Sequence, residues 1–551
     1  MSELLTAHRA LLDWAKSSPG REFLLQPVNG QLQTLTYRQA ADQASRMAAA
    51  LVDLGMRPGD RVAILGKNSV EWVLADLAIA MAGLISVPIY PTANAETVAY
   101  VLEHSGARVA FVGKLDEPDA IGKAIPGALP TIAFPYPGVT GTHDWRELID
   151  EHAPIDDPHQ PDAQDVMTIL YTSGSTGRPK GVTISYRAYE YACSSARGTV
   201  KFGPGDRLLS YLPLAHVTER MVLVGPAMYA GARIFFVESL KTFNKDLQTA
   251  QPTIFGSVPR LWVKFQAGIH AKIPPAKLKR LLSIPVVNRI IAHKIRVGMG
   301  LARCRVFASG TAPISPHTLH WYRKLGIDIG EGWGMSETSG LACANVPFHA
   351  RRTGTIGIPL EHTELKISDE GELLIRSPGL FTEYYKQPEL TKESFTEDGF
   401  FRTGDKAEWD ERKKGFRITG RVKDIFKSAK GKYVAPVRIE SLLSANPLLD
   451  QICVVGHGLP APIALVVAGE AAQDMPRTQV ADSLKATLSE VNGQLESHER
   501  LSNIMVVKDE WTTENGLLTP TLKAKRDVIE ERYHATLEKG LKAPVAWEDD
   551  L

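Results

Sequence analysis

Cysteine is scarce in this chain of 551 residues, which has only four cysteines, all far apart in the sequence. Without a CxxC pair or a dense set of cysteines, the sequence offers neither a zinc ribbon nor a disulfide framework, and a reducing compartment is the simpler interpretation. An excess of one charge is also lacking, because 63 lysines and arginines face 62 aspartates and glutamates. No overall field therefore attracts nucleic acid or a membrane, although local basic surface remains open.

Long apolar runs are lacking as well. The longest, Leu77 to Tyr90, is shorter than a bilayer-spanning helix and ends in a strand-like Val-Pro segment. The first 18 residues carry charged side chains inside their apolar pattern, which predicts an amphipathic helix rather than a secretory signal. We therefore expect no transmembrane helix and a cytoplasmic protein, with peripheral contact to the inner face of a membrane left open.

The chain alternates between helical and strand-like patterns. The spacing of apolar residues predicts helices over residues 37–55 and 69–81 and strands at 61–65 and 84–90. This rhythm continues to residue 171 and favours an α/β fold with largely parallel sheets. After residue 420 a smaller pattern of strands and helices begins, so we predict two domains, residues 1–420 and 421–551.

One loop is built to hold an anion. Tyr171 to Val182 reads YTSGSTGRPKGV, which combines hydroxyls, glycines and two cations. A Walker loop of nucleotide hydrolases requires GxxxxGK[ST] followed by a helix. Here proline occupies position 179, Gly181 follows Lys180, and Gly181 to Ser185 (GVTIS) predicts a strand. Spacing and context both exclude the Walker loop.

The string YTSGSTGRPKGV resembles the phosphate-binding signature of the adenylate-forming superfamily, which includes acyl-CoA synthetases, peptide-synthetase adenylation domains and firefly luciferase. Further signatures of the superfamily follow in order, namely SGTAPIS from Ser309, GEGWGMSET from Gly330, RTGD from Arg402 and GRVKD from Gly420. The resemblance covers essentially the whole chain. It implies a large N-terminal domain of stacked sheets with flanking helices, which binds ATP and the acyl group, and a small mobile α+β C-terminal domain.

The resemblance also assigns site residues. The implied ATP- and AMP-binding residues are Thr172, Ser173, Gly174, Ser175, Thr176, Gly177, Lys180, Ser309, Gly310, Thr311, Gly332, Trp333, Gly334, Met335, Ser336, Asp405 and Arg421. Trp333 is expected against the adenine, Asp405 on the ribose hydroxyls, and Arg421 on the ribose or phosphate. Mg²⁺ is expected on Thr172 and Glu337, where it would neutralise the phosphates.

A catalytic lysine is implied in the small domain, where the superfamily carries P-x-T-x-x-G-K. Here the stretch is LTPTLKAKR, Leu518 to Arg526, with alanine for glycine and two lysines. The alignment predicts Lys525 as the catalytic lysine and leaves Lys523 as the alternative. The resemblance further implies Lys423 as the hinge between two half-reactions, and Lys427 and Gly431 beside the path of coenzyme A.

Three further features make the sequence look most like long-chain acyl-CoA synthetases: LTPTLKAKR, YLPLAH from Tyr211 and SVPRLW from Ser257. His216 is either a satisfied core histidine or a catalytic group beside the acyl or thiol path. Trp262 either lines the acyl tunnel or is a structural core residue. Basic and apolar residues interleave from Lys264 to Arg305, which fits either a membrane-contacting surface or a solvated helical face.

The sequence thus predicts a fatty acid:CoA ligase for medium- to long-chain acids, with ATP and CoA as co-substrates, Mg²⁺ as cofactor and no nucleic acid partner. Its expected catalytic residues are Lys180, His216, Glu337 and Lys525. Two alternatives remain: an acyl-AMP ligase that delivers to a carrier protein, and a noncatalytic fatty-acid or acyl-adenylate binding protein. The sequence leaves open the chain-length preference, the pathway and the oligomeric state, a homodimer included.

Overall fold

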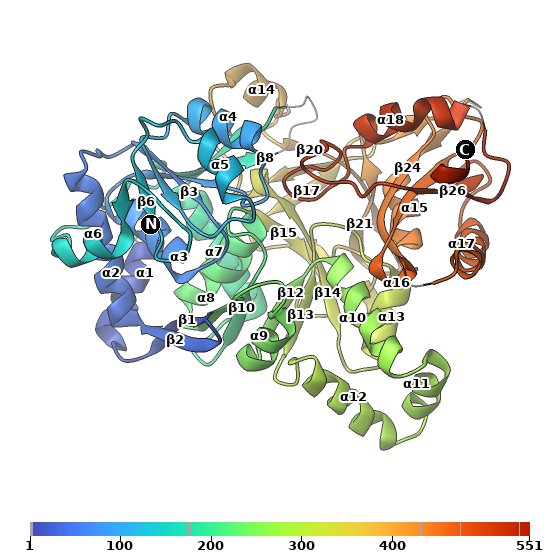
Figure 1. Cartoon of the computed structure of the whole chain (residues 1–551), viewed down its shortest axis with the longest axis horizontal. Coiled ribbons are helices and arrows are strands. Elements are labelled where there is room, and N and C mark those ends of the chain that lie inside the picture. The colour runs from blue at the N-terminus through green and yellow to red at the C-terminus, as the bar shows by residue number, and fades with distance from the viewer. Residues whose placement is uncertain (1–3, 173–177, 430–431, 474, 539) are drawn as a thin grey trace.

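The computed structural model describes residues 4–172, 178–429, 432–473, 475–538 and 540–551. The described residues form a large N-terminal part and a smaller C-terminal part, which lies at the upper right of Figure 1. No helix among the described residues is long and apolar enough to cross a membrane. The expected α/β architecture with two parts of unequal size is confirmed.

The largest sheet has eight strands, and the two strands that flank the anion loop lie near one end of the strand order. That order is β19 (Glu383–Tyr384), β9 (Lys180–Ser185), β8 (Val166–Thr172), β4 (Ile85–Ile89), β3 (Arg61–Leu65), β5 (Val109–Val112), β6 (Thr131–Ala133) and β7 (His143–Asp144). The strands from β8 to β7 pair in parallel, whereas β9 runs antiparallel to both of its neighbours. The predicted parallel sheet is confirmed, and the strand that runs in the opposite direction is β9, which follows the anion loop.

Three more sheets complete the N-terminal part. The first contains β12 (Ile254–Ser257), β13 (Val306–Ser309), β14 (Ile329–Met335), β15 (Gly340–Ala344) and β16 (Ile358–Pro359). The second contains β10 (Arg207–Ser210), β11 (Arg233–Phe236), β1 (Glu22–Val28) and β2 (Gln31–Thr36). The third contains β17 (Glu364–Ile367), β18 (Glu372–Arg376), β20 (Phe401–Asp410) and β21 (Gly415–Arg421), and it is wholly antiparallel.

Helices cover these sheets. In the N-terminal part they are α1 (Ala7–Ser17), α2 (Tyr37–Asp53), α3 (Val70–Met81), α4 (Ala95–Ser105), α5 (Pro118–Ala124), α6 (Trp145–Glu151), α7 (Tyr186–Val200), the π-helix η1 (Thr218–Val224), α8 (Gly225–Tyr229), α9 (Phe243–Ala250), α10 (Pro259–Lys272), α11 (Pro275–Leu282), α12 (Val287–Gly298), α13 (Pro316–Arg323) and α14 (Pro388–Glu393). Short 3₁₀ turns are η2 (Ser336–Thr338) and η3 (Ala350–Arg352). The predicted helices at the N-terminus, over 37–55 and over 69–81 are confirmed as α1, α2 and α3.

Local signals fix these helix ends. Thr36 caps α2 in a reciprocal capping box with Gln39, and Gly55 follows the helix with a φ of +81°. Glycine adopts that left-handed conformation without strain, so the helix ends two residues before the predicted boundary. Ser69 caps α3 by accepting a hydrogen bond from the backbone N–H of Trp72.

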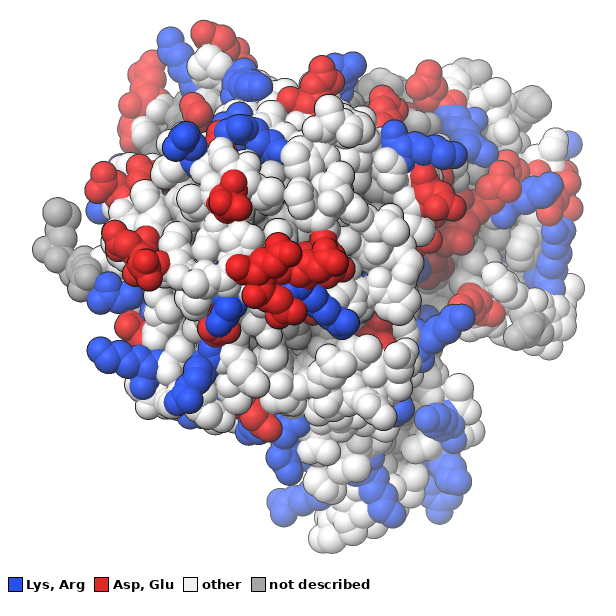
Figure 2. All heavy atoms as spheres, turned by 60° about the vertical axis from the view of Figure 1, so that its left-hand side comes forward, with Lys and Arg blue, Asp and Glu red and all other residues white. Residues whose placement is uncertain are grey.

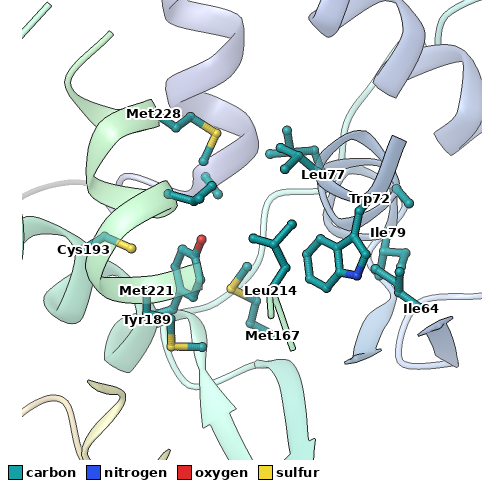
Figure 3. Packing of buried hydrophobic residues seen from close by; sticks show 14 of the residues in the cluster. Ile64, Trp72, Leu77, Ile79, Met167, Tyr189, Cys193, Leu214, Met221 and Met228 are labelled. Carbon is teal, nitrogen blue, oxygen red and sulfur yellow. The ribbon is translucent and has the colours of Figure 1, made fainter. Parts of the chain in front are cut away.

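The main core lies where α3 packs against α7 and α8. Figure 3 shows Trp72 and Leu77 of α3 facing Tyr189 and Met228 from the opposite side. A buried ion pair crosses the same region, in which Arg220 donates two hydrogen bonds to Asp76, at 2.9 and 2.6 Å. Such bidentate pairing compensates for the cost of burying both charges, and it ties the start of η1 to α3.

The C-terminal part has its own core. Its sheet contains β24 (Leu449–Val455), β25 (Ile463–Ala468), β26 (Asn503–Val507) and β27 (Val545–Trp547), and a small hairpin joins β22 (Phe426–Lys427) to β23 (Tyr433–Val434). Its helices are α15 (Pro436–Leu443), α16 (Glu470–Gln473), α17 (Arg477–Asn492), α18 (Arg526–Glu538) and the 3₁₀ turn η4 (Glu548–Asp550). Separate apolar clusters cover the two faces of its sheet, which is the organisation of an independent folding unit.

Candidate functional site

The anion loop connects two antiparallel strands, as its sequence context predicts. Thr172, the last residue of β8, pairs with Lys180, the first residue of β9. The expected phosphate ligands Ser173, Gly174, Ser175, Thr176 and Gly177 lie outside the described residues. The two strands nevertheless fix the residues on both sides of the loop, next to the edge strand β19 of the eight-stranded sheet.

Lys180, Glu337 and Tyr384 form one cluster beside the loop. The Nζ atom of Lys180 lies 3.2 Å from Oε1 of Glu337 and 3.8 Å from the centre of the Tyr384 ring. The Tyr384 hydroxyl donates to the same Oε1 atom at 2.9 Å. Glu337 is buried, so these two partners compensate for the desolvation of its carboxylate. The cluster offers one fixed cation and one fixed anion next to the loop.

Hard oxygen ligands are available for a divalent cation at this point. The Thr172 hydroxyl is buried and has no hydrogen-bond partner among the described residues. Because a buried hydroxyl without a partner is costly, its orientation suits a ligand. The described residues contain no cluster of three or more acidic, histidine or cysteine side chains that could hold a metal ion. Mg²⁺ commonly binds through one or two carboxylates together with substrate phosphates, so Thr172 and Glu337 fit that chemistry.

Asp405 is held by two partners that leave part of its carboxylate open. The Trp333 indole N–H donates a hydrogen bond to Oδ2 at 2.8 Å, and the Arg421 Nε atom forms an ion pair with Oδ1 at 2.9 Å. Asp405 and Arg421 are direct cross-strand neighbours on β20 and β21. An ionised carboxylate can accept about four hydrogen bonds, so two sites remain for a diol.

The adenine-side segments lie on neighbouring parallel strands, β13 and β14, where Ser309 pairs with Glu331. The Ser309 hydroxyl is buried without a partner among the described residues, and the Gly310 amide donates to the Ser257 carbonyl at 3.2 Å. At Gly334 a Cβ atom would lie 1.6 Å from the Gly340 carbonyl oxygen, so only glycine fits this turn of β14. Of the other residues expected on this side, Thr311 follows Gly310, Gly332 and Met335 lie in β14, and Ser336 begins η2.

Of the two candidate lysines, Lys523 lies in a turn of the C-terminal part that contacts the N-terminal part. It closes a tight turn in which its backbone N–H donates to the Thr519 hydroxyl, and the Thr519 N–H donates to its carbonyl. The turn contacts the N-terminal part, because the Thr92 hydroxyl donates to the Pro520 carbonyl at 2.6 Å. Lys525 is the residue before α18, and its backbone N–H donates to the Leu517 carbonyl.

The charge of Lys523 interacts with charged residues that include Asp405 and Glu337 of the N-terminal part. Desolvation lowers the pKa of its ammonium, and the neighbouring Arg421 lowers it further. The carboxylates of Asp405 and Glu337 act in the opposite direction. Lys523 therefore lies within electrostatic reach of the residues that are expected to hold the ribose and the metal.

His216 lies in the same cleft as a neutral imidazole. Its Nδ1 accepts a hydrogen bond from the Thr218 backbone N–H at 3.1 Å. Burial lowers the pKa of His216 to about 4, and the charge of Lys523 contributes. At neutral pH the ring therefore carries no charge, and its other nitrogen is free to donate. Both interpretations of His216, a satisfied core histidine and a group beside the acyl or thiol path, stay predictions.

Trp262 is fully buried in α10 and packs edge-on against Phe255 and Tyr322, with ring centroids 5.4 and 5.0 Å away. Its indole N–H points to the Ala308 carbonyl at 3.4 Å. The structural interpretation accounts for these contacts, and a role in an acyl tunnel stays a prediction. Lys423 lies in the turn after β21 and Lys427 in β22, while Gly431 lies outside the described residues.

Sequence reasoning missed Glu219, although it follows YLPLAH by only three residues. Glu219 lies in η1, and its side chain is completely buried. Its Oε1 accepts the Tyr211 backbone N–H at 3.2 Å, and Oε2 has no partner among the described residues. Burial raises the pKa of Glu219 from 4.5 to about 8, so the carboxyl is protonated at neutral pH. The signal in the sequence that could have indicated Glu219 is its position, as a charged residue, close to the largely apolar YLPLAH motif.

The raised pKa predicts a pH-dependent stability. The folded state keeps the Glu219 proton between pH 4.5 and 8, whereas the unfolded chain loses it, so this contribution falls as pH rises through that window. The unfolding free energy of the unchanged protein is expected to fall between pH 6 and pH 8. In Glu219→Gln this fall is expected to be smaller by about 2 kcal/mol, because glutamine does not titrate. Urea unfolding of both proteins at the two pH values measures this difference. Equal pH dependence of the two proteins would contradict the assignment.

Comparison with known proteins places these residues in a known context. The AMP-binding enzyme family matches residues 11–385, and the AMP-binding enzyme C-terminal domain matches residues 423–542. The chain is similar to the long-chain-fatty-acid–CoA ligase FadD15 of Mycobacterium tuberculosis, with 32% identity over 93% of each chain. It is 27% identical to human long-chain-fatty-acid–CoA ligase 1, over 92% of this chain and 82% of that one.

A solved structure shows the same fold over nearly the whole length. The adenylation domain of a carboxylate reductase from Mycobacterium chelonae superimposes with a TM-score of 0.82 at 25% identity. The match covers 97% of this chain and 91% of that domain. The expected arrangement of a large and a small domain is therefore confirmed at the level of the fold.

Proposed function

Because the chain belongs to the AMP-binding enzyme family, we propose that it is an ATP-dependent fatty acid:CoA ligase. In the first half-reaction, a fatty acid carboxylate attacks the α-phosphate of ATP, and acyl-AMP and pyrophosphate form. In the second, the thiolate of CoA attacks the acyl carbon, and acyl-CoA and AMP leave. The observation that carries this proposal is the cluster of Lys180, Glu337 and Tyr384 beside the anion loop.

The first half-reaction brings two anions together, and the described cations offset that repulsion. Lys180, fixed beside Glu337, holds the leaving pyrophosphate. Lys523 pairs with the attacking carboxylate or the α-phosphate from the opposite side, and we propose it in place of Lys525 as the adenylation lysine. Mg²⁺, when bound by Thr172 and Glu337, supplies charge neutralisation at the phosphates.

The nucleotide is oriented by the remaining residues. Asp405 accepts the ribose hydroxyls through the acceptor sites that Trp333 and Arg421 leave open. Ser309 and Gly310 lie at the end of β13, where the chain comes close enough for backbone contact with the base. The neutral imidazole of His216, next to Lys523, orients the reacting acyl group or thiol without adding charge.

The second half-reaction requires the Lys523 turn to leave the cleft. We propose that the small domain, residues 421–551, rotates about Lys423 and brings Lys427 and Gly431 to the CoA path. Contacts that hold the described arrangement include the part-buried Thr92 to Pro520 hydrogen bond and the exposed Arg260 to Asp450 ion pair. Exposed ion pairs contribute little free energy, so breaking the Arg260 pair during the rotation costs little.

Product analysis tests the proposed acceptor. Incubation with ATP, Mg²⁺ and a fatty acid is expected to give acyl-AMP and pyrophosphate, and addition of CoA is expected to convert acyl-AMP to acyl-CoA and AMP. If acyl-AMP accumulates with CoA but is discharged by an acyl carrier protein, the carrier-delivering alternative is correct. If the fatty acid binds and ATP remains intact, the chain is a noncatalytic binding protein.

A further inference from the structure

The two helices α11 and α12, with the turn that joins them, form a lobe that extends from the bottom of the molecule in Figure 1. We call residues 275–298 the basic lobe. It buries very little of its own surface, because only Leu278 of α11 and Ala292 of α12 are buried. Two short helices with so few buried side chains present an apolar face without a partner in the described chain.

Large apolar side chains are exposed together on the basic lobe. The exposed fractions are 42% for Ile284, 67% for Val286, 51% for Ile290 and 51% for Val297. Val286 also has a φ of +69°, which is strained for a β-branched residue. Isolated apolar residues on a surface need no explanation, but a group of them within 14 residues marks an interaction site.

The charge around these side chains has one sign. No aspartate or glutamate occurs between Asp246 and Asp328, although a chain with 62 acidic residues among 551 would place about nine in that interval. Figure 2 shows the lobe at the bottom in blue and white, without red. The exposed basic residues are Lys272, Lys277, Lys279, Arg280, Arg289 and Lys294. None of them has a carboxylate within ion-pair distance in the described chain.

The combination of exposed isoleucine and valine with unpaired cations identifies the partner by its chemistry. A second copy of the chain would bring two basic lobes together, and their like charges would repel. Nucleic acid would use the cations, but single strands stack on aromatic rings, and the exposed apolar residues of the lobe are aliphatic. An anionic lipid surface matches both features. Its headgroups attract the cations, and the boundary between headgroups and acyl chains accepts the aliphatic side chains.

We propose that the basic lobe docks this protein on the surface of a membrane that contains anionic lipids. The lobe is attached to the site-bearing domain through α10, whose Trp262 packs on Tyr322 and points to Ala308, one residue before Ser309. Docking therefore sets the orientation of the whole large domain against the membrane, which is the reservoir of fatty acids. The proposal does not depend on the ligase activity, because docking requires neither ATP nor an acid.

Vesicle cosedimentation of the full chain without nucleotide tests the docking. Vesicles of phosphatidylcholine are compared with vesicles in which part of the lipid is phosphatidylglycerol. We expect binding to the anionic vesicles, little binding to the neutral ones, and loss of most binding when salt is raised from about 0.1 to about 0.5 M. Absence of binding to anionic vesicles at low salt overturns the proposal.

Variants separate the two features of the lobe. Lys279→Gln with Arg280→Gln is expected to lower partitioning onto anionic vesicles at least tenfold, since each cation near such a surface contributes roughly fivefold. Ile290→Ser is expected to lower it by about fivefold through lost apolar contact. The matched controls are Arg38→Gln with Lys123→Gln, and Val52→Ser, whose side chain is 48% exposed on α2. The controls are expected to bind as the unchanged protein does.

Three outcomes would contradict membrane docking even if the variants fold. The first is equal loss of binding in the lobe variants and the controls. The second is tighter binding to single-stranded RNA than to anionic vesicles, with Ile290→Ser unaffected, which would assign the lobe to nucleic acid. The third is a dimer that Ile290→Ser dissociates, seen by sedimentation velocity. ATP–pyrophosphate exchange with a water-soluble short-chain acid is measured alongside, so that failure of the ligase activity is seen separately.

Discussion

Replacing Lys523 by alanine is expected to lower the rate of acyl-AMP formation about 10³-fold. The backbone of the turn that carries Lys523 is fixed by Thr519 and by the contact of Pro520 with Thr92, and the Lys523 ammonium interacts electrostatically with Asp405 and Glu337. Removal of a charge that stabilises the transition state typically costs two to three orders of magnitude in rate, at about 1.4 kcal/mol per factor of ten. ATP–pyrophosphate exchange with a fatty acid measures this half-reaction alone.

The matched control for Lys523→Ala is Lys525→Ala. Lys525 immediately precedes α18, and we expect its loss to change the exchange rate much less. A second readout excludes a folding defect, because thioester formation from preformed acyl-AMP and CoA is expected to proceed normally in Lys523→Ala. If Lys525→Ala loses exchange and Lys523→Ala keeps it, the alignment of LTPTLKAKR that the sequence first suggested is the correct one.

Replacing Glu337 by glutamine is expected to lower turnover about 10²-fold and to shift the Mg²⁺ dependence to higher concentration. The amide keeps the size of the side chain and an acceptor for the Tyr384 hydroxyl, but it removes the charge that faces Lys180. Loss of one anionic ligand weakens a magnesium site that has few protein ligands. Initial rates over a range of Mg²⁺ concentrations at fixed ATP measure both effects.

Tyr384→Phe is the control for Glu337→Gln. It removes a hydrogen bond to the same oxygen and leaves the carboxylate charged, so we expect about a tenfold loss of rate with an unshifted Mg²⁺ curve. An unchanged Mg²⁺ dependence in Glu337→Gln would show that the metal binds elsewhere. Loss of folding in either variant would appear as a changed urea midpoint and would be seen independently of the rates.

Local patterns predicted much of the fold. Helix α2 follows from apolar spacing, and the strand-loop-strand context of the anion loop follows from the strand-like run Gly181 to Ser185 after Lys180. The antiparallel sheet of β17, β18, β20 and β21 was not predicted, because short strands with mixed exposure carry no clear period. Pairing partners far apart in the sequence are decided by packing and not by local propensity.

The site was predicted less completely than the fold. Motifs named Lys180, Glu337 and Asp405, but they could not show that Trp333 would donate to Asp405 or that Tyr384 would join Glu337. Those contacts join segments 72 and 47 residues apart. The proposal of Lys523 in place of Lys525 rests on a turn closed by Thr519 that contacts the other domain, and no spacing rule encodes such a contact.

The central claim is that this cleft activates a fatty acid with ATP, and ATP–pyrophosphate exchange tests it most directly. The purified chain is incubated with ATP, Mg²⁺ and labelled pyrophosphate, and saturated fatty acids of increasing chain length are added one at a time. We predict exchange that depends on both the acid and Mg²⁺, and that rises towards medium and long chains. Absence of exchange with every fatty acid would contradict the assigned substrate class.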